Sequence, residues 1–78
     1  MNEIKRPDIP QVVTVEFVKL YLAYLEKIKD DDEKAHGDED ALYIIIMEAI
    51  RDNKCEDIKK CCELALKSLD IEFSRWCA

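Results

Sequence analysis

The sequence has few of the residues that form tight turns. Its 78 residues include one glycine and two prolines, whereas a sheet of several strands needs such residues at its turns. Long apolar runs are also missing: the longest, 41–47, is much too short for a helix that spans a bilayer. Residues 1–7 lack the apolar segment of a secretory signal. We therefore expect a helical protein of the cytoplasm that does not enter a membrane.

Residues for catalysis or metal binding are equally scarce. His36 is the only histidine, so a paired nucleophile and base would have to use it. A single glycine cannot build a phosphate-binding loop. A calcium loop that starts at Asp32 would place Lys34 and Tyr43 where oxygen ligands of the carboxylate type are needed. We expect no enzymatic activity, no cofactor and no metal site.

The four cysteines, Cys55, Cys61, Cys62 and Cys77, do not form the closely spaced pairs of a structural zinc site. Cys61 and Cys62 are adjacent in a segment expected to be helical, about 100° apart around the axis, so they cannot both face one partner. A cytoplasmic protein rarely keeps disulfides. We expect reduced thiols that act as small apolar side chains.

Acidic residues outnumber basic ones, 18 to 12, which gives a formal net charge of −6. Segment 26–40 holds eight acids and three lysines, so it carries −5 of that charge. Direct binding of nucleic acid needs clustered Lys and Arg, which the sequence does not provide. The molecule is instead expected to have one strongly acidic end.

Hydrophobic periodicity predicts an all-α fold: a three-helix bundle in a single helical domain, 12–78, after a short extended N-terminal arm, 1–11. The helices are expected at about 14–30, 39–52 and 54–76. Thr14 and Asn53 suit N-caps, the latter in a capping box with Glu56. Between the first two helices, 30–38 reads as a polar loop in which Gly37 takes a positive φ. The third helix is expected to face inward with Ile58, Cys62, Ala65, Leu69, Phe73 and Trp76.

The run 42–47 is apolar around nearly two turns of helix, and a bundle of three short helices covers only part of it. The face of Leu42, Ile46 and Ala49 is expected to be buried. Tyr43, Ile44 and Met47 lie furthest from that face, so we expect them in the interface of a homodimer.

These features favour a small acidic interaction protein, either an inhibitor or an adaptor, that binds a basic surface of a partner protein. A cleft that normally holds nucleic acid is one example, and phage-encoded anti-defence inhibitors of similar size and charge act in this way. The expected contact residues are those of the acidic end: Asp30, Asp31, Asp32, Glu33, Asp38, Glu39 and Asp40. The alternative is a structural or assembly subunit that acts through its apolar helix faces as a homo-oligomer.

Overall fold

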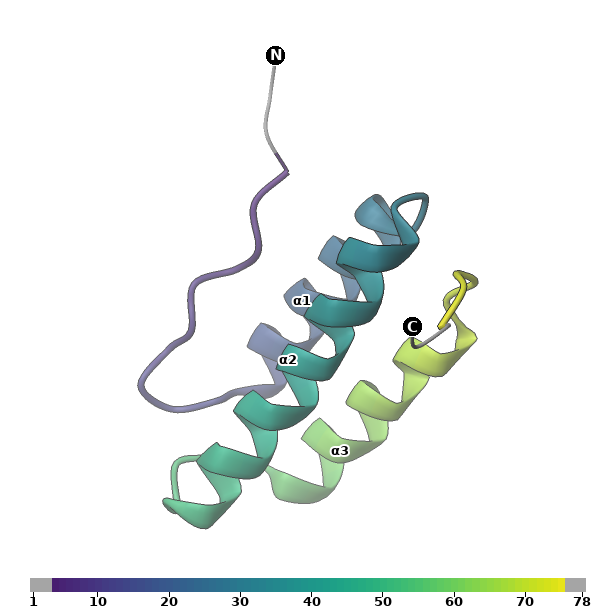
Figure 1. Ribbon diagram of the computed structural model, residues 1–78. Coiled ribbons are helices and arrows are strands. Elements are labelled where there is room, and N and C mark those ends of the chain that lie inside the picture. Colours follow the sequence, from purple (N-terminus) through teal and green to yellow (C-terminus); the bar gives the residue numbers. More distant parts are fainter. Residues whose placement is uncertain (1–3, 76–78) are drawn as a thin grey trace.

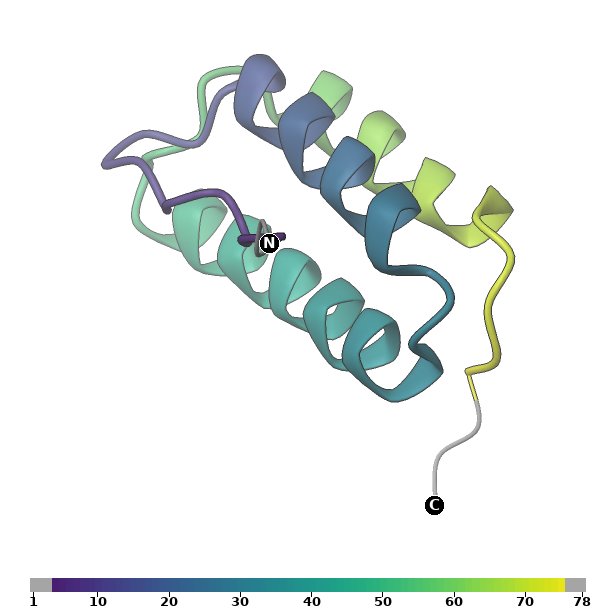
Figure 2. The same ribbon diagram turned by 90° about the horizontal axis from the view of Figure 1, so that it is seen from above.

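The computed structural model describes residues 4–75 of the chain. It contains three α-helices, α1 (Val15–Ile28), α2 (Asp32–Arg51) and α3 (Ile58–Leu66), followed by a 3₁₀ turn, η1 (Lys67–Asp70). The helices pack side by side, with α2 antiparallel to the other two (Figure 1; Figure 2 shows the bundle from above). The all-α three-helix bundle is therefore confirmed, and the described residues contain no strand.

Helix α1 begins where the sequence predicts. The Thr14 hydroxyl oxygen accepts a hydrogen bond from the Phe17 amide at 3.0 Å, as an N-cap residue should. The helix buries one broad face, formed by Phe17, Val18, Tyr21, Tyr24, Leu25 and Ile28. Just before it, Val13 forms an isolated parallel bridge with Cys55, which ties the start of α1 to the connection between α2 and α3.

The prediction that the second helix starts near Glu39, after a polar loop, is wrong. Asp31 caps α2 by accepting a hydrogen bond from the Lys34 amide at 3.2 Å, and Asp32 and Glu33 form the first turn. Carboxylates stabilise a helix N-terminus because they oppose the positive end of its dipole. Gly37 is helical and does not have a positive φ. One glycine weakens a helix by only about 0.5–1 kcal/mol, so it does not end this one.

The corner between α2 and α3 also differs from the prediction. Asn53 is not the N-cap of the third helix; it has a φ of 58° and closes α2. The amides of Asn53 and Lys54 donate to the carbonyls of Ile50 and Ala49, which is the Schellman pattern at a helix C-terminus. Asn tolerates this left-handed conformation better than most residues. The N-cap of α3 is Asp57.

Helix α3 is shorter than predicted and rotated. It ends at Leu66, and residues 71–75 continue without helix. Its buried side chains are Cys61, Leu64 and Ala65, and Ser68 of η1 is buried on the same side. Ile58 and Leu69, expected inside, are 50% and 57% exposed. Trp76, also expected inside, lies outside the described residues.

Most buried positions of α1 and α2 agree with the sequence analysis. Leu42 and Ile46 are buried in the core with the aromatic side chains of α1. Residues 4–12 lie in no helix or strand; the predicted arm, 1–11, includes all of them except Val12, and residues 1–3 are not described. Among the helices of the described residues, none is both long and apolar enough to cross a membrane.

Candidate functional site

Exposed carboxylates gather where α1 turns into α2. Asp30, Asp31, Asp32 and Glu33 are all exposed. The chain after η1 adds Glu72, which is also exposed and close enough to Lys29 to help raise the pKa of that lysine, after the larger effect of Glu26. We call these five acids, Asp30, Asp31, Asp32, Glu33 and Glu72, the acidic corner.

Two members of the acidic corner also serve the fold. Asp31 caps α2, and the Asp32 carboxylate accepts a hydrogen bond from the Ser74 amide at 3.0 Å, which holds the C-terminal segment. No hydrogen bond or ion pair within residues 4–75 involves the side-chain carboxylate of Asp30 or Glu33, although the charge of Asp30 helps to raise the pKa of Lys29. These two carboxylates are therefore the ones most available to a partner protein.

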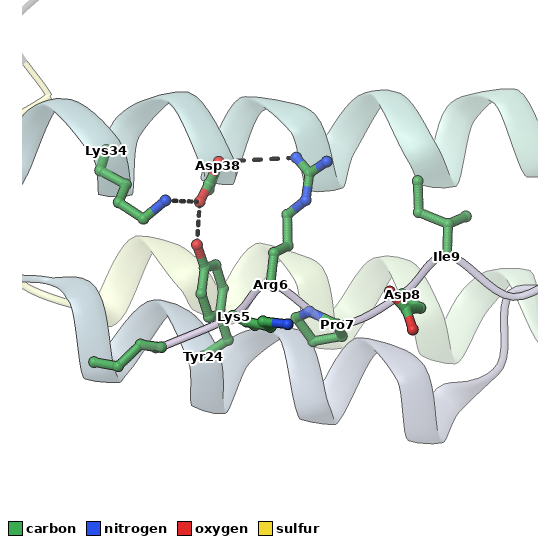
Figure 3. Close-up of a pocket in the computed structure, with 9 residues that line it drawn as sticks. Lys5, Arg6, Pro7, Asp8, Ile9, Tyr24, Lys34 and Asp38 are labelled. Atoms are coloured by element: carbon green, nitrogen blue, oxygen red, sulfur yellow. Dashed lines mark hydrogen bonds and ion pairs between the residues drawn. The ribbon is translucent and has the colours of Figure 1, made fainter. Parts of the chain in front are cut away.

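Asp38 was expected on the acidic surface, but most of its bonding capacity is used inside the molecule. Its carboxylate accepts a hydrogen bond from the Tyr24 hydroxyl and lies 3.7 Å from Lys34 and 3.8 Å from Arg6 (Figure 3). Its backbone carbonyl accepts from the Tyr21 hydroxyl at 2.6 Å. Asp38 thus joins α1, α2 and residues 4–9. Residues 4–9 and Asp38 line a hollow of about 690 Å³.

Burial raises the pKa of Tyr21 to about 12, and the same effect, with the hydrogen bond to Asp38, raises the pKa of Tyr24 to about 12. Both phenols therefore remain neutral donors over the physiological range. Their hydroxyls hold Asp38 through hydrogen bonds. A side chain that transfers protons near neutral pH would need a pKa much closer to the pH of the solution.

Glu39 is not a surface residue, which corrects its place in the expected contact set. It is 3% exposed and meets Arg75 in a two-pronged ion pair, with Nε–Oε1 at 2.9 Å and Nη2–Oε2 at 3.0 Å. The Ser68 hydroxyl donates to the same carboxylate at 2.6 Å, and Tyr43 shares a hydrogen bond with Ser68. Burial disfavours the charged form of Glu39, but the hydrogen bonds from Arg75 and Ser68 outweigh it and lower the pKa.

Arg75 also donates to the backbone carbonyls of Ser68 and Ile71, at 2.8 and 3.0 Å, and lies over the Phe73 ring. The Glu39 network therefore fastens the segment after η1 onto α2. No buried side-chain polar atom of the described residues lacks a partner. A satisfied buried network of this kind stabilises one arrangement of the chain.

Apolar side chains are exposed along the line where α2 and α3 meet. A hollow of about 300 Å³ is lined only by apolar residues and by the ring of Tyr43, among them Met47, Cys62 and Leu66. Met47 is 62% exposed and Leu66 60%. We define the α2–α3 face as the exposed or half-buried residues that line this hollow: Tyr43, Met47, Ile50, Cys62 and Leu66.

The residues predicted for a dimer interface fall partly on this face. Met47 and the half-buried Tyr43 line the hollow, whereas Ile44, 53% exposed, lies on the outer side of α2 beside Met47. Sequence analysis missed the contribution of α3. The spacing of Ile58, Cys62 and Leu66, four residues apart, was the signal for a second apolar stripe.

The network of Glu39, Ser68 and Arg75 was also missed, and the sequence offers no local signal for it because its members are 29 and 36 residues apart. Cys55, Cys61 and Cys62 are free thiols. Burial, with the neighbouring Cys55 as a second cause, raises the pKa of Cys61 to about 11, so that thiol is unreactive at neutral pH. Within residues 4–75, no three His, Cys, Asp or Glu side chains are grouped to hold a metal ion.

Comparison with protein-family models, with curated proteins and with solved structures found no match in any of the three.

Proposed function

We propose that this protein is a non-enzymatic interaction protein that binds a basic surface of a partner protein through its acidic corner, as an inhibitor or an adaptor. The observation that carries the proposal is the exposure of Asp30 and Glu33 beside Asp31 and Asp32, in a segment that holds most of the net negative charge of the chain. A partner surface that normally holds nucleic acid has the complementary charge.

The position of these acids supports binding to a protein of opposite charge. Asp31, Asp32 and Glu33 lie at the N-terminus of α2, which together with the turn from α1 forms one end of the bundle (Figure 1). Complementary charge raises the association rate and selects among partners, and salt weakens the attraction. Binding through the acidic corner should therefore be sensitive to salt.

The test begins with capture of host proteins on the immobilised protein, which are then identified by mass spectrometry. We expect at least one nucleic-acid-binding protein that is retained in low salt, released in 0.5 M salt and displaced by duplex DNA. The double variant Asp30→Asn, Glu33→Gln removes two charges without touching the cap at Asp31 or the bond from Asp32 to Ser74.

This double variant should weaken binding to the captured protein about tenfold, while its circular dichroism spectrum stays unchanged. The matched control is Glu56→Gln, Glu63→Gln, which removes two exposed acids from the other part of the chain. Equal loss in both variants would show that net charge, and not the acidic corner, determines binding. A captured protein that resists both salt and DNA would refute the proposal.

A second candidate function is assembly of copies of this chain through apolar helix faces, which is favoured by the exposure of Ile44, Met47 and Leu66. Large apolar side chains gain about 1.5–3 kcal/mol each when fully removed from water. We propose a homodimer for this reason. The two candidates are compatible because they use different surfaces.

Two smaller features complete the proposal. We propose that residues 1–11 act as an arm; in the part that the structure describes, Arg6 lies 3.8 Å from Asp38 of α2. The protein works in the cytoplasm, where thiols such as Cys55 and Cys62 stay reduced.

A further inference from the structure

Exposed residues of α2 form a stripe with charge at both ends. Asp40, Ile44, Met47 and Arg51 follow one another at intervals of four, three and four residues, so they lie along one side of the helix. All four are exposed. The stripe therefore reads acid, apolar, apolar, base from the middle of α2 to its C-terminus.

Helix α3 repeats this order in the opposite chain direction. Lys59 lies in its first turn, Cys62 and Leu66 follow on the α2–α3 face, and Asp70 comes at the end of η1. Because α3 runs antiparallel to α2 (Figure 1), both acids lie toward one end of the α2–α3 face and both bases toward the other.

The polarity extends beyond these residues. At the basic end, Arg51 pairs with the neighbouring Asp52, with Nε–Oδ1 at 2.9 Å, yet segment 51–60 still holds four bases against three acids, a net of +1. At the acidic end, Asp40 has His36 at 3.9 Å, and Asp70 of η1 is a second exposed acid. The apolar centre thus lies between two ends of opposite charge.

We propose that the α2–α3 face binds a second copy of the chain in antiparallel orientation, with the acidic end of each copy against the basic end of the other. The proposal rests on the homodimer suggested above and specifies its surface and direction. Two copies related by a two-fold axis meet through the same patch on each.

Two arrangements would bring the α2–α3 face of one copy against that of the other. An axis parallel to the helices would place acidic end against acidic end. An axis across the helices reverses one copy, so that α2 lies against α2 and α3 against α3, each acid near a base. The charges select the second arrangement, since like charges disfavour the first. In it, Asp40 of each copy faces Arg51 of the other, with Met47 near the axis and Ile44 beside it at the edge of the interface.

The first experiment locates the surface by sedimentation equilibrium at micromolar concentrations. We expect the unaltered protein to have about twice the monomer mass of 9.1 kDa. Met47→Glu should raise the dimer dissociation constant at least about a hundredfold, because it places a charge in each half of an apolar interface. The matched control is Leu20→Glu, at an equally exposed apolar position of α1 (57%), which should leave the constant within about twofold.

The second experiment determines the orientation through charge reversal. Asp40→Lys alone and Arg51→Glu alone should each raise the dissociation constant about tenfold, because each homodimer then sets like charges together. An equimolar mixture of the two variants should recover dimers, since each chain supplies the charge that the other needs. Native mass spectrometry resolves these heterodimers, and circular dichroism verifies that both variants fold.

Each outcome has a distinct meaning. A mass of 9.1 kDa for the unaltered protein would overturn the homodimer and this inference together. A dimer that Leu20→Glu disrupts and Met47→Glu does not would leave the homodimer standing but overturn the α2–α3 face. A mixture that does not recover dimers would overturn the antiparallel orientation alone. None of these results bears on binding by the acidic corner.

Discussion

The first half of α2 contains a buried charged side chain, whereas the second half contains large apolar side chains that are exposed. In the first half, the carboxylate of Glu39 is buried, 3% exposed, with every oxygen bonded to Ser68 or Arg75. In the second half, Ile44 and Met47 are 53% and 62% exposed. The reason lies in their neighbours. The C-terminal segment covers the first half and supplies a cation, whereas nothing in the described residues covers the outer side of the second half.

This contrast separates residues that hold the fold from residues available for binding. A buried charge requires a fixed partner, so Glu39 contributes to one unique arrangement of the segment after η1. Exposed isoleucine and methionine side chains gain when another surface covers them. Within α2, Glu39 is therefore assigned to structure, and the exposed Ile44 and Met47 to association.

The largest expected effect comes from breaking the Glu39 network. Glu39→Ala should lower the free energy of unfolding by about 2–3 kcal/mol, because it leaves the Arg75 guanidinium and the Ser68 hydroxyl without their acceptor. This value is below the range of about 3–5 kcal/mol for a fully buried pair, because the Arg75 side chain is 28% exposed. Urea denaturation followed by circular dichroism measures the change.

The control for that experiment is the next residue of the same helix. Asp40→Ala removes an exposed acid and should change the free energy of unfolding by no more than about 0.5 kcal/mol. The measurement is made at a protein concentration below the dissociation constant of the proposed dimer. If the two alanine variants lose the same stability, the contrast between the two halves of α2 fails.

A smaller effect concerns pH. Glutamate ionises near 4.5 when it is not perturbed, and the bonds from Arg75 and Ser68 lower the pKa of Glu39 in the folded state. Its contribution to stability is therefore complete above about 4.5 and is lost as the pH falls through the folded-state pKa. In Glu39→Gln this part of the acid dependence should disappear, so its stability should change less between pH 5 and pH 3. Parallel curves for the two proteins would contradict the assignment.

The smallest effect tests whether residues 32–38 are helical. A Cβ added to Gly37 would meet no atom within 4 Å, and alanine favours a helix over glycine. Gly37→Ala should therefore raise the free energy of unfolding by about 0.5–1 kcal/mol. In a loop with a positive φ at Gly37, the same change would lower it, so the sign of the measured difference decides between the two structures.

The sequence predicts local features of this fold well. Thr14 caps α1 as expected, and the periodicity of α2 places Leu42 and Ile46 inside and Met47 outside. Features that depend on distant residues escape it. The single glycine favours a loop, but the cap at Asp31, whose residue type suits an N-cap, starts the helix before it. The local sequence favours an exposed Glu39, because its partner Arg75 follows only 36 residues later.

The candidate surfaces divide in the same way. The exposure of Asp30 and Glu33 follows from their polarity and position, and the structure agrees. The contribution of α3 to the apolar surface depends on how the helix is rotated about its axis. The inward face predicted from the sequence differs from the observed one by about one residue position. Small shifts of this kind move a residue such as Leu69 from inside to outside, because adjacent positions on a helix differ by about 100°.

The most direct test of the division within α2 is a dilution series of ¹H–¹⁵N amide spectra from millimolar to low micromolar concentration. The account predicts shifts that depend on concentration in residues 40–51 and 58–70, with little change in residues 31–39 or around Leu20 of α1. Spectra that do not change on dilution, or shifts centred on α1, would contradict it.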